Sequence, residues 1–137
     1  MPRNRLLRDI AVLVCIIAAL QFTAISFHLY WTFWWYDIIL HFLGGIFVGL
    51  LILWFRFFSG YFGVHQHTSE VSTFFFIVIA TLIVGVGWEA FERALGQTWS
   101  VEGYYVDTIL DVIFDLIGSV VAFYFFRSRY MTHEKNV

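Results

Sequence analysis

The sequence is poor in charged residues, cysteine and proline, and each scarcity excludes a class of fold or a structural feature. Only 13% of its 137 residues are charged, whereas soluble domains carry about a quarter, so a water-soluble fold would lack polar surface. The single cysteine, Cys15, excludes an intrachain disulfide. The single proline, Pro2, precedes the first apolar run, so no helix is expected to carry a proline kink. The net charge of −2 gives no indication of a nucleic-acid partner.

Apolar residues in long runs take the place of the missing charge. They make up 61% of the chain, and in a bilayer they face lipid instead of water. Four runs reach the roughly 20 residues that a membrane-spanning helix needs. We predict helices at about 9–30, 36–58, 71–95 and 106–126, separated by shorter segments. The expected fold is therefore all-α, a four-helix transmembrane bundle that forms one domain over residues 1–137.

The basic residues predict how this bundle is oriented. Four crossings leave Arg93 alone on one side of the membrane and all the other basic residues on the side of the chain ends. Cytoplasmic segments are enriched in Lys and Arg, so both termini should be cytoplasmic. The residues on the predicted cytoplasmic side are Arg3, Arg5, Arg8, Arg56, Arg127, Arg129 and Lys135.

Most acidic residues fall on the opposite, outer side. That side receives Asp37, Glu89, Glu92, Glu102, Asp107, Asp111 and Asp115. Side chains three or four residues apart share one face of a helix. This spacing recurs in each of the last three helices, in Asp37 and His41, in Glu89 and Glu92, and in Asp107, Asp111 and Asp115.

The faces that carry the acids also carry small residues, which let membrane helices pack closely. Gly45 and Gly49 follow His41, Gly85 precedes Glu89, and Gly118 follows Asp115. We therefore expect the acids and His41 to point into the bundle. A charge at that depth costs about 2.5–3.5 kcal/mol or more, so these side chains require neutralisation.

Three remedies could neutralise the buried acids. They could protonate, pair with Arg93 or bind a divalent cation, and one arginine is too few for so many carboxylates. A site that includes His41 suits zinc, manganese or iron, whereas an all-oxygen subset suits calcium or magnesium. Asp37 and Asp107 could instead stabilise helix N-termini. The candidate metal ligands are His41, Glu89, Glu92, Asp111, Asp115, Asp37 and Asp107.

These same residues carry a resemblance to known families. The motifs are YDIILHFLGG at 36–45, EAFE at 89–92 and DTILD at 107–111, followed by Asp115 and Gly118. Their order resembles the YjdF-like family of small bacterial integral membrane proteins and, more loosely, the VanZ-like family, which is associated with glycopeptide resistance. The resemblance implies a multi-pass protein of the bacterial inner membrane. It marks these residues and implies no particular reaction.

Three functions are open at this point. The first is binding of a metal cation or protons at a site near the outer membrane face. The second is a metal-dependent membrane enzyme acting on a lipid or cell-envelope substrate, with Glu89 or Asp115 as general base. The third is a structural or accessory membrane subunit. Membrane lipids are the expected partners, with a second copy of the chain or another membrane protein as further candidates. The Gly45 and Gly49 face could pack against a second copy or be used inside the bundle.

Overall fold

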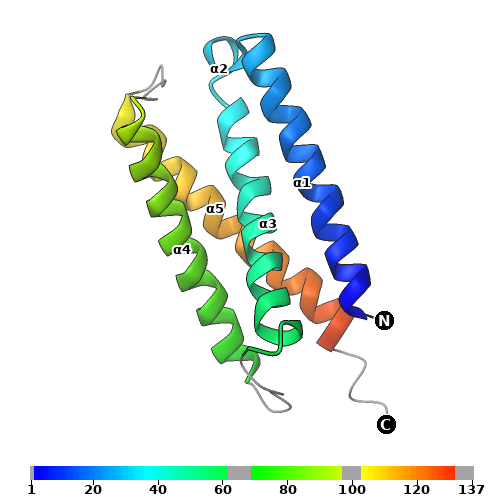
Figure 1. The fold of residues 1–137 in the computed structure, drawn as a ribbon. Coiled ribbons are helices and arrows are strands. Elements are labelled where there is room, and N and C mark those ends of the chain that lie inside the picture. The colour runs from blue at the N-terminus through cyan, green and yellow to red at the C-terminus, as the bar shows by residue number, and fades with distance from the viewer. Residues whose placement is uncertain (1, 62–68, 97–102, 132–137) are drawn as a thin grey trace.

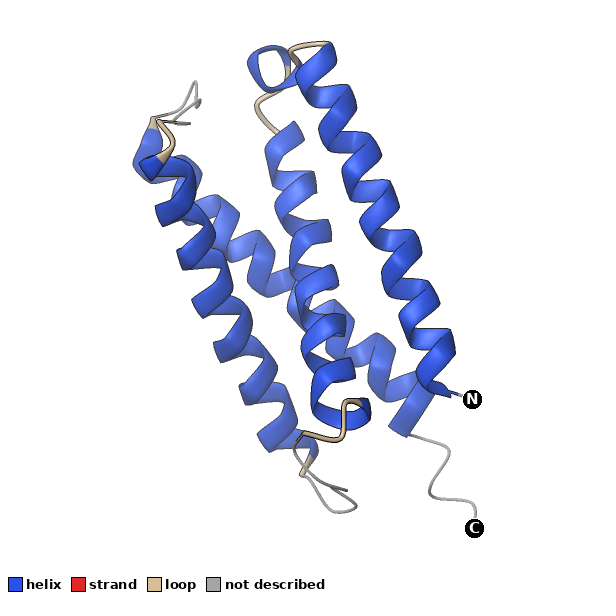
Figure 2. Ribbon diagram, viewed as in Figure 1, coloured by secondary structure: helices blue, strands red, loops and turns tan. Residues whose placement is uncertain are grey.

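The computed structural model describes residues 2–61, 69–96 and 103–131. In these segments every regular element is helical (Figure 2). The elements, in chain order, are α1 (Pro2–Ser26), α2 (Leu29–Thr32), α3 (Tyr36–Phe58), α4 (Glu70–Ala94), α5 (Tyr104–Phe126) and a short π-helical turn, η1 (Arg127–Met131). Glu102 and Lys135, which entered the charge analysis, lie outside the described residues.

Four of these helices are long and apolar enough to cross a membrane, which confirms the predicted all-α fold with four spans. The candidate spans are Arg3–Ser26, Tyr36–Phe58, Glu70–Ala94 and Tyr104–Met131. The start of α1 and the end of η1 lie at the same end of the bundle (Figure 1), as four crossings require. We call this the terminal end, and the opposite end, where α3 and α5 begin, the acidic end. The cytoplasmic placement of the terminal end stays a prediction.

The first helix differs most from its predicted bounds of 9–30. It begins at Pro2 and ends at Ser26, because the basic N-terminal segment continues the helix beyond the apolar run. The chain then turns at His28, whose φ of 54° lies in the left-handed region, and α2 follows. The aromatic residues of this turn resemble a continuing apolar run in the sequence, which is why the prediction extended to Tyr30.

Helices α3 and α5 form the closest contact in the bundle. A Cβ atom at Gly45 would collide with the carbonyl oxygen of Asp115, and one at Gly118 would collide with that of Phe42. A Cβ at Gly49 would lie 2.8 Å from the Cβ of Ala122. Only glycine therefore permits this approach of two backbones. The Gly45 and Gly49 face is used inside the bundle, against α5.

The apolar core occupies the terminal end of the bundle. Residues of α1, α3, α4 and α5 contribute to it, and Leu53, Ile77 and Phe126 are almost completely buried. Ion pairs lie at its rim, where Arg127 Nε is 2.9 Å from Glu70 Oε2 and both side chains are about half exposed. The buried groups of the acidic end are of a different kind, and they form the candidate site.

Candidate metal centre

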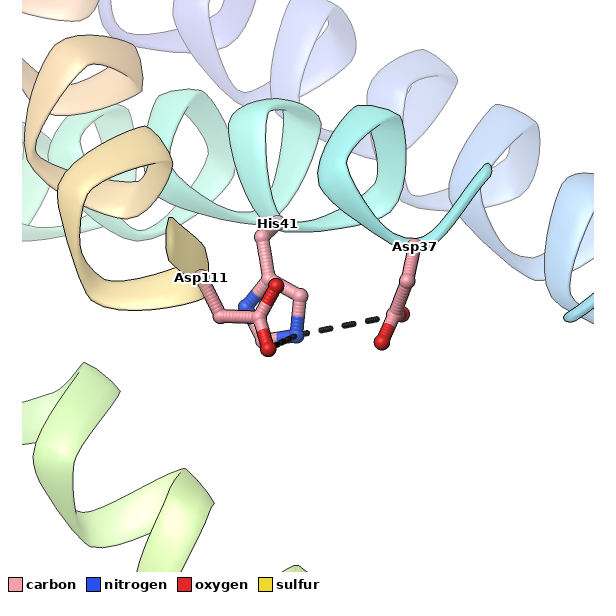
Figure 3. A group of neighbouring side chains, drawn as sticks. All are labelled: Asp37, His41 and Asp111. Atoms are coloured by element: carbon pink, nitrogen blue, oxygen red, sulfur yellow. Dashed lines mark ion pairs between the residues drawn. The ribbon is translucent and has the colours of Figure 1, made fainter. Parts of the chain in front are cut away.

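His41 lies at the centre of a polar cluster in the acidic half of the bundle. It is in the second turn of α3 and only 7% exposed. Its Nε2 atom faces three carboxylates, with Asp37 Oδ1 at 3.9 Å, Glu89 Oε1 at 3.9 Å and Asp111 Oδ2 at 3.8 Å. Figure 3 shows the imidazole beside two of them, one from its own helix and one from α5. Three helices thus converge on one nitrogen.

The local sequence explains how the three helices bring these groups together. Asp37 and His41 are one helical turn apart on α3, as their spacing predicted. The glycine contact between α3 and α5 sets the depth of Asp111, which is 2% exposed. Glu89 is on the buried face of α4, in line with Gly85. The prediction that the acids and His41 point into the bundle is confirmed for these residues.

The distances around Nε2 are unusual for a hydrogen-bonded cluster. They exceed the 2.7–3.2 Å typical of an N–H···O hydrogen bond. Two ligands of one metal ion, each about 2.0–2.2 Å from it, lie up to about 4.4 Å apart. The distance from Nε2 to each of the three oxygens is therefore within the range that two ligands of one ion have. Glu89 Oε1 supports this interpretation, because it is buried and has no hydrogen-bond partner.

Asp115 lies on the other edge of the imidazole ring. Its Oδ1 atom is 3.5 Å from Nδ1 of His41, the shortest of the four carboxylate distances. Small residues surround this side chain, and a Cβ at Gly85 would lie 2.6 Å from its Oδ2. A proton on Nδ1 directed at Asp115 leaves the lone pair of Nε2 directed at the other carboxylates. This is how an outer carboxylate orients a metal-binding histidine.

Glu92 and Asp107 complete the predicted set. His41, Glu89 and Glu92 offer ligand atoms within 4.8 Å of one another, as do Asp37, His41 and Asp111. Asp107 lines a cavity beside the cluster. The structure therefore gathers five of the six predicted acids around His41, and it places Asp107 at the margin. Their role as metal ligands stays a prediction.

Arg93 has its contact elsewhere. Its guanidinium carbon lies 4.5 Å from the ring centroid of Tyr104, at the start of α5. The ion pairs of Asp37, Glu89 and Asp111 instead involve His41. The arrangement therefore keeps several acids around a single imidazole, as the charge count predicted.

Gln21 and Tyr30 are not among the predicted metal ligands. Tyr30 donates a hydrogen bond to Oε1 of Gln21, and both side chains line the two cavities beside the cluster. Burial, followed by the charge of Asp37, raises the pKa of the Tyr30 phenol above its ordinary value, so it stays a donor at neutral pH. Gln21 is the first strongly polar side chain after Asp9 in an apolar run, and that signal could have identified it.

The fold and the cluster together define a class, a multi-pass membrane protein with a polar centre buried among its helices. The family model described as predicted membrane protein (DUF2238) matches residues 3–132, and the chain belongs to this family. No curated protein and no solved structure matches the chain. The chemistry of the centre must therefore be argued from its own residues.

Proposed function

We propose that the acidic half of this membrane protein binds one divalent metal ion. The proposed ligands are Nε2 of His41 and carboxylate oxygens drawn from the two groups whose ligand atoms lie within 4.8 Å of one another, Asp37 with Asp111 and Glu89 with Glu92. The observation that carries the proposal is the convergence of three oxygens, from three helices, at 3.8–3.9 Å from one imidazole nitrogen.

A metal ion satisfies the buried groups better than protons do. When two carboxylates share one proton, they form a short O–H···O hydrogen bond of about 2.5–2.7 Å. Glu89 Oε1, by contrast, is buried with no hydrogen-bond partner. A buried oxygen left in that condition costs about 1–3 kcal/mol, and more when it is charged. A cation between Nε2 and the oxygens removes this cost and offsets the mutual repulsion of the acids.

The donor set selects among metals. Calcium and magnesium take oxygen ligands almost exclusively. One imidazole with carboxylates suits zinc, manganese or iron. Asp115 strengthens this choice, because a carboxylate on Nδ1 makes Nε2 a more basic ligand. We therefore infer a first-row transition metal or zinc. The motif resemblance to the YjdF-like and VanZ-like families stays a prediction beside this proposal.

Metal analysis of the full chain tests the proposal. The chain is purified in detergent, stripped with a chelator and titrated separately with zinc, manganese and iron(II), and metal content and thermal stability are measured. We expect about one equivalent of one metal and a metal-dependent rise in melting temperature. In His41→Ala the affinity should fall by more than the about 10–100-fold that loss of an outer carboxylate costs.

The control variant is His28→Asn. His28 lies outside the ligand groups, and asparagine tolerates its left-handed backbone conformation. It should bind metal as the wild type does. The proposal is overturned if the wild type and His41→Ala bind each metal equally, or if none of the three metals changes the melting temperature of the wild type. Proton-linked or purely structural roles for the acids would then take its place.

A further inference from the structure

A cavity of about 360 Å³ adjoins the candidate centre and extends from it along the helices. Most of its wall residues come from α1, α3 and α4, with Tyr30 from α2 and Asp115 from α5. At the acidic end the walls are polar and include His41, Asp37 and Glu92. Further along, they are apolar, with Ile17 from α1 and Val48 from α3. Val48 is seven residues beyond His41, so the apolar part reaches about 10 Å deeper into the membrane span.

The cavity lies where the bundle is least closed. Helix α1 packs against α2 and α3, and α4 packs against α3 and α5, whereas the described residues of α1 and α4 contact each other at most marginally. Val14 on one side of the opening is 40% exposed, and Val84 and Trp88 on the other side are about half exposed. These residues belong to candidate membrane spans. The opening between α1 and α4 therefore faces the hydrocarbon of the bilayer.

A second cavity of about 350 Å³ continues from the centre toward the acidic end. It shares Gln21, Tyr30, Asp37 and Glu92 with the first, and it adds Asp107. No lysine or arginine of the described chain lines either of these two cavities. A molecule that occupies both would have an apolar part in the bilayer, a middle part at the metal centre and an end among carboxylates.

The geometry points to a phospholipid with an ammonium headgroup, of the ethanolamine type, as the occupant of these two cavities. One acyl chain fills the apolar cavity between α1 and α4. The ammonium group lies among the carboxylates of Glu92 and Asp107, where its positive charge is complementary. The phosphate lies between chain and ammonium, beside His41, where it would complete the coordination of a bound metal. Only this last contact rests on the proposed function.

Two features favour this lipid over other ligands of the membrane. An anionic headgroup without an ammonium group would meet carboxylates and no lysine or arginine, which is unfavourable. A wholly apolar molecule would cover the carboxylates of Asp37 and Glu92 in place of water, and burying charged groups without compensation is costly. The ethanolamine headgroup offers both an oxygen ligand and a cation.

Native mass spectrometry with a defined lipid mixture tests the inference. The full chain in detergent is incubated with equal amounts of dioleoyl phosphatidylethanolamine and dioleoyl phosphatidylglycerol, once metal-free and once metal-loaded, and bound lipid is counted. We expect the wild type to retain the ethanolamine lipid at least about tenfold more than the glycerol lipid, equivalent to ~1.4 kcal/mol. Equal retention of the two lipids in both metal states overturns the inference.

Paired variants locate the site. Ile17→Trp fills the apolar cavity and should lower retention of both lipids, whereas Ile16→Trp, whose side chain is 47% exposed on the outside of α1, should not. Val48→Phe fills the cavity from α3 and serves if Ile17→Trp fails to fold. Glu92→Gln should keep lipid bound and lose the preference for ethanolamine. Wild-type retention in both filling variants would overturn the inference.

The two proposals fail in different ways. If the chain binds metal but shows no lipid preference, the proposed metal site stands and the lipid inference fails. If the chain prefers the ethanolamine lipid but binds no metal, the lipid inference stands and the proposed metal site fails.

Discussion

The two halves of the bundle bury residues of opposite chemistry on the same helices. Toward the terminal end, α3 buries Leu53 and α5 buries Phe126, and the ion pair of Arg127 with Glu70 lies at the partly exposed rim. Toward the acidic end, α3 buries His41 and α5 buries Asp111, which is 2% exposed. Burying polar groups costs stability unless they are fully partnered. The comparison therefore separates a half whose buried apolar side chains stabilise the fold from a half that carries the proposed metal site.

The contact between α3 and α5 joins both halves, so breaking it should have the largest effect. In Gly118→Leu the new side chain meets the backbone of α3 at the carbonyl of Phe42, and the two helices must separate. We expect destabilisation of more than about 4–5 kcal/mol, an exceptional value for one substitution, and loss of metal binding. Unfolding by SDS titration, with metal content measured in parallel, provides the test.

Gly87→Ala is the matched control for the glycine substitution. No atom lies within 4 Å of a Cβ at this position of α4. Removing a mid-helix glycine there should be neutral or stabilising by about 0.5–1 kcal/mol. A Gly118→Leu chain as stable as Gly87→Ala would show that the close approach of α3 and α5 does not determine the fold.

A substitution confined to the apolar half should separate stability from binding. Leu53→Ala leaves a cavity in the fully buried core and should cost about 2–5 kcal/mol in unfolding free energy. The metal affinity of the folded chain should stay unchanged, because the centre lies several turns away on α3. Leu51→Ala is the control, since Leu51 is 40% exposed. A large loss of metal affinity in Leu53→Ala would contradict the division into two halves.

A substitution beside the centre should lower metal affinity and leave stability nearly unchanged. Asp115→Asn removes the charge that faces Nδ1 of His41 and keeps the size of the side chain in its glycine-lined position. We expect the metal dissociation constant to rise by about 10–100-fold with little change in stability. Cobalt substitution, followed by visible absorption, should show an altered ligand field. Asp107→Asn, at the margin, should change both readouts less, and an equal effect would place Asp107 among the ligands.

Much of this comparison could be predicted from the sequence. Apolar run length identified the four spans, and the spacing of Asp37 and His41 predicted their shared face. Periodicity gives the face of a helix but not its neighbour, so the glycine contact of Gly45 and Gly118 with backbone required the structure. The same limit explains why Asp115 was grouped with the other acids: the edge of the imidazole it faces depends on how α3 and α5 are rotated about their axes. The turn at His28 was missed because its neighbours are apolar.

The smallest of these predicted effects is the change in apo stability in Glu89→Gln, and whether stability rises or falls is the informative result. Glu89 is 7% exposed, and its Oε1 lies 3.9 Å from His41 with no hydrogen-bond partner. Without metal, Glu89→Gln removes one of several mutually repelling carboxylates, and the apo chain should gain about 0.5–2 kcal/mol, as substitutions that relieve a strained functional site do. The same variant should lose most of the rise in melting temperature that metal gives the wild type.

Glu70→Gln is the control, because it removes an exposed partner of Arg127 at the terminal end. It should change apo stability by no more than about 1 kcal/mol and keep the metal-dependent rise in melting temperature. Apo stability that falls in Glu89→Gln would mean that the carboxylate already has a stabilising role without metal, and the acidic half would then serve folding as the apolar half does.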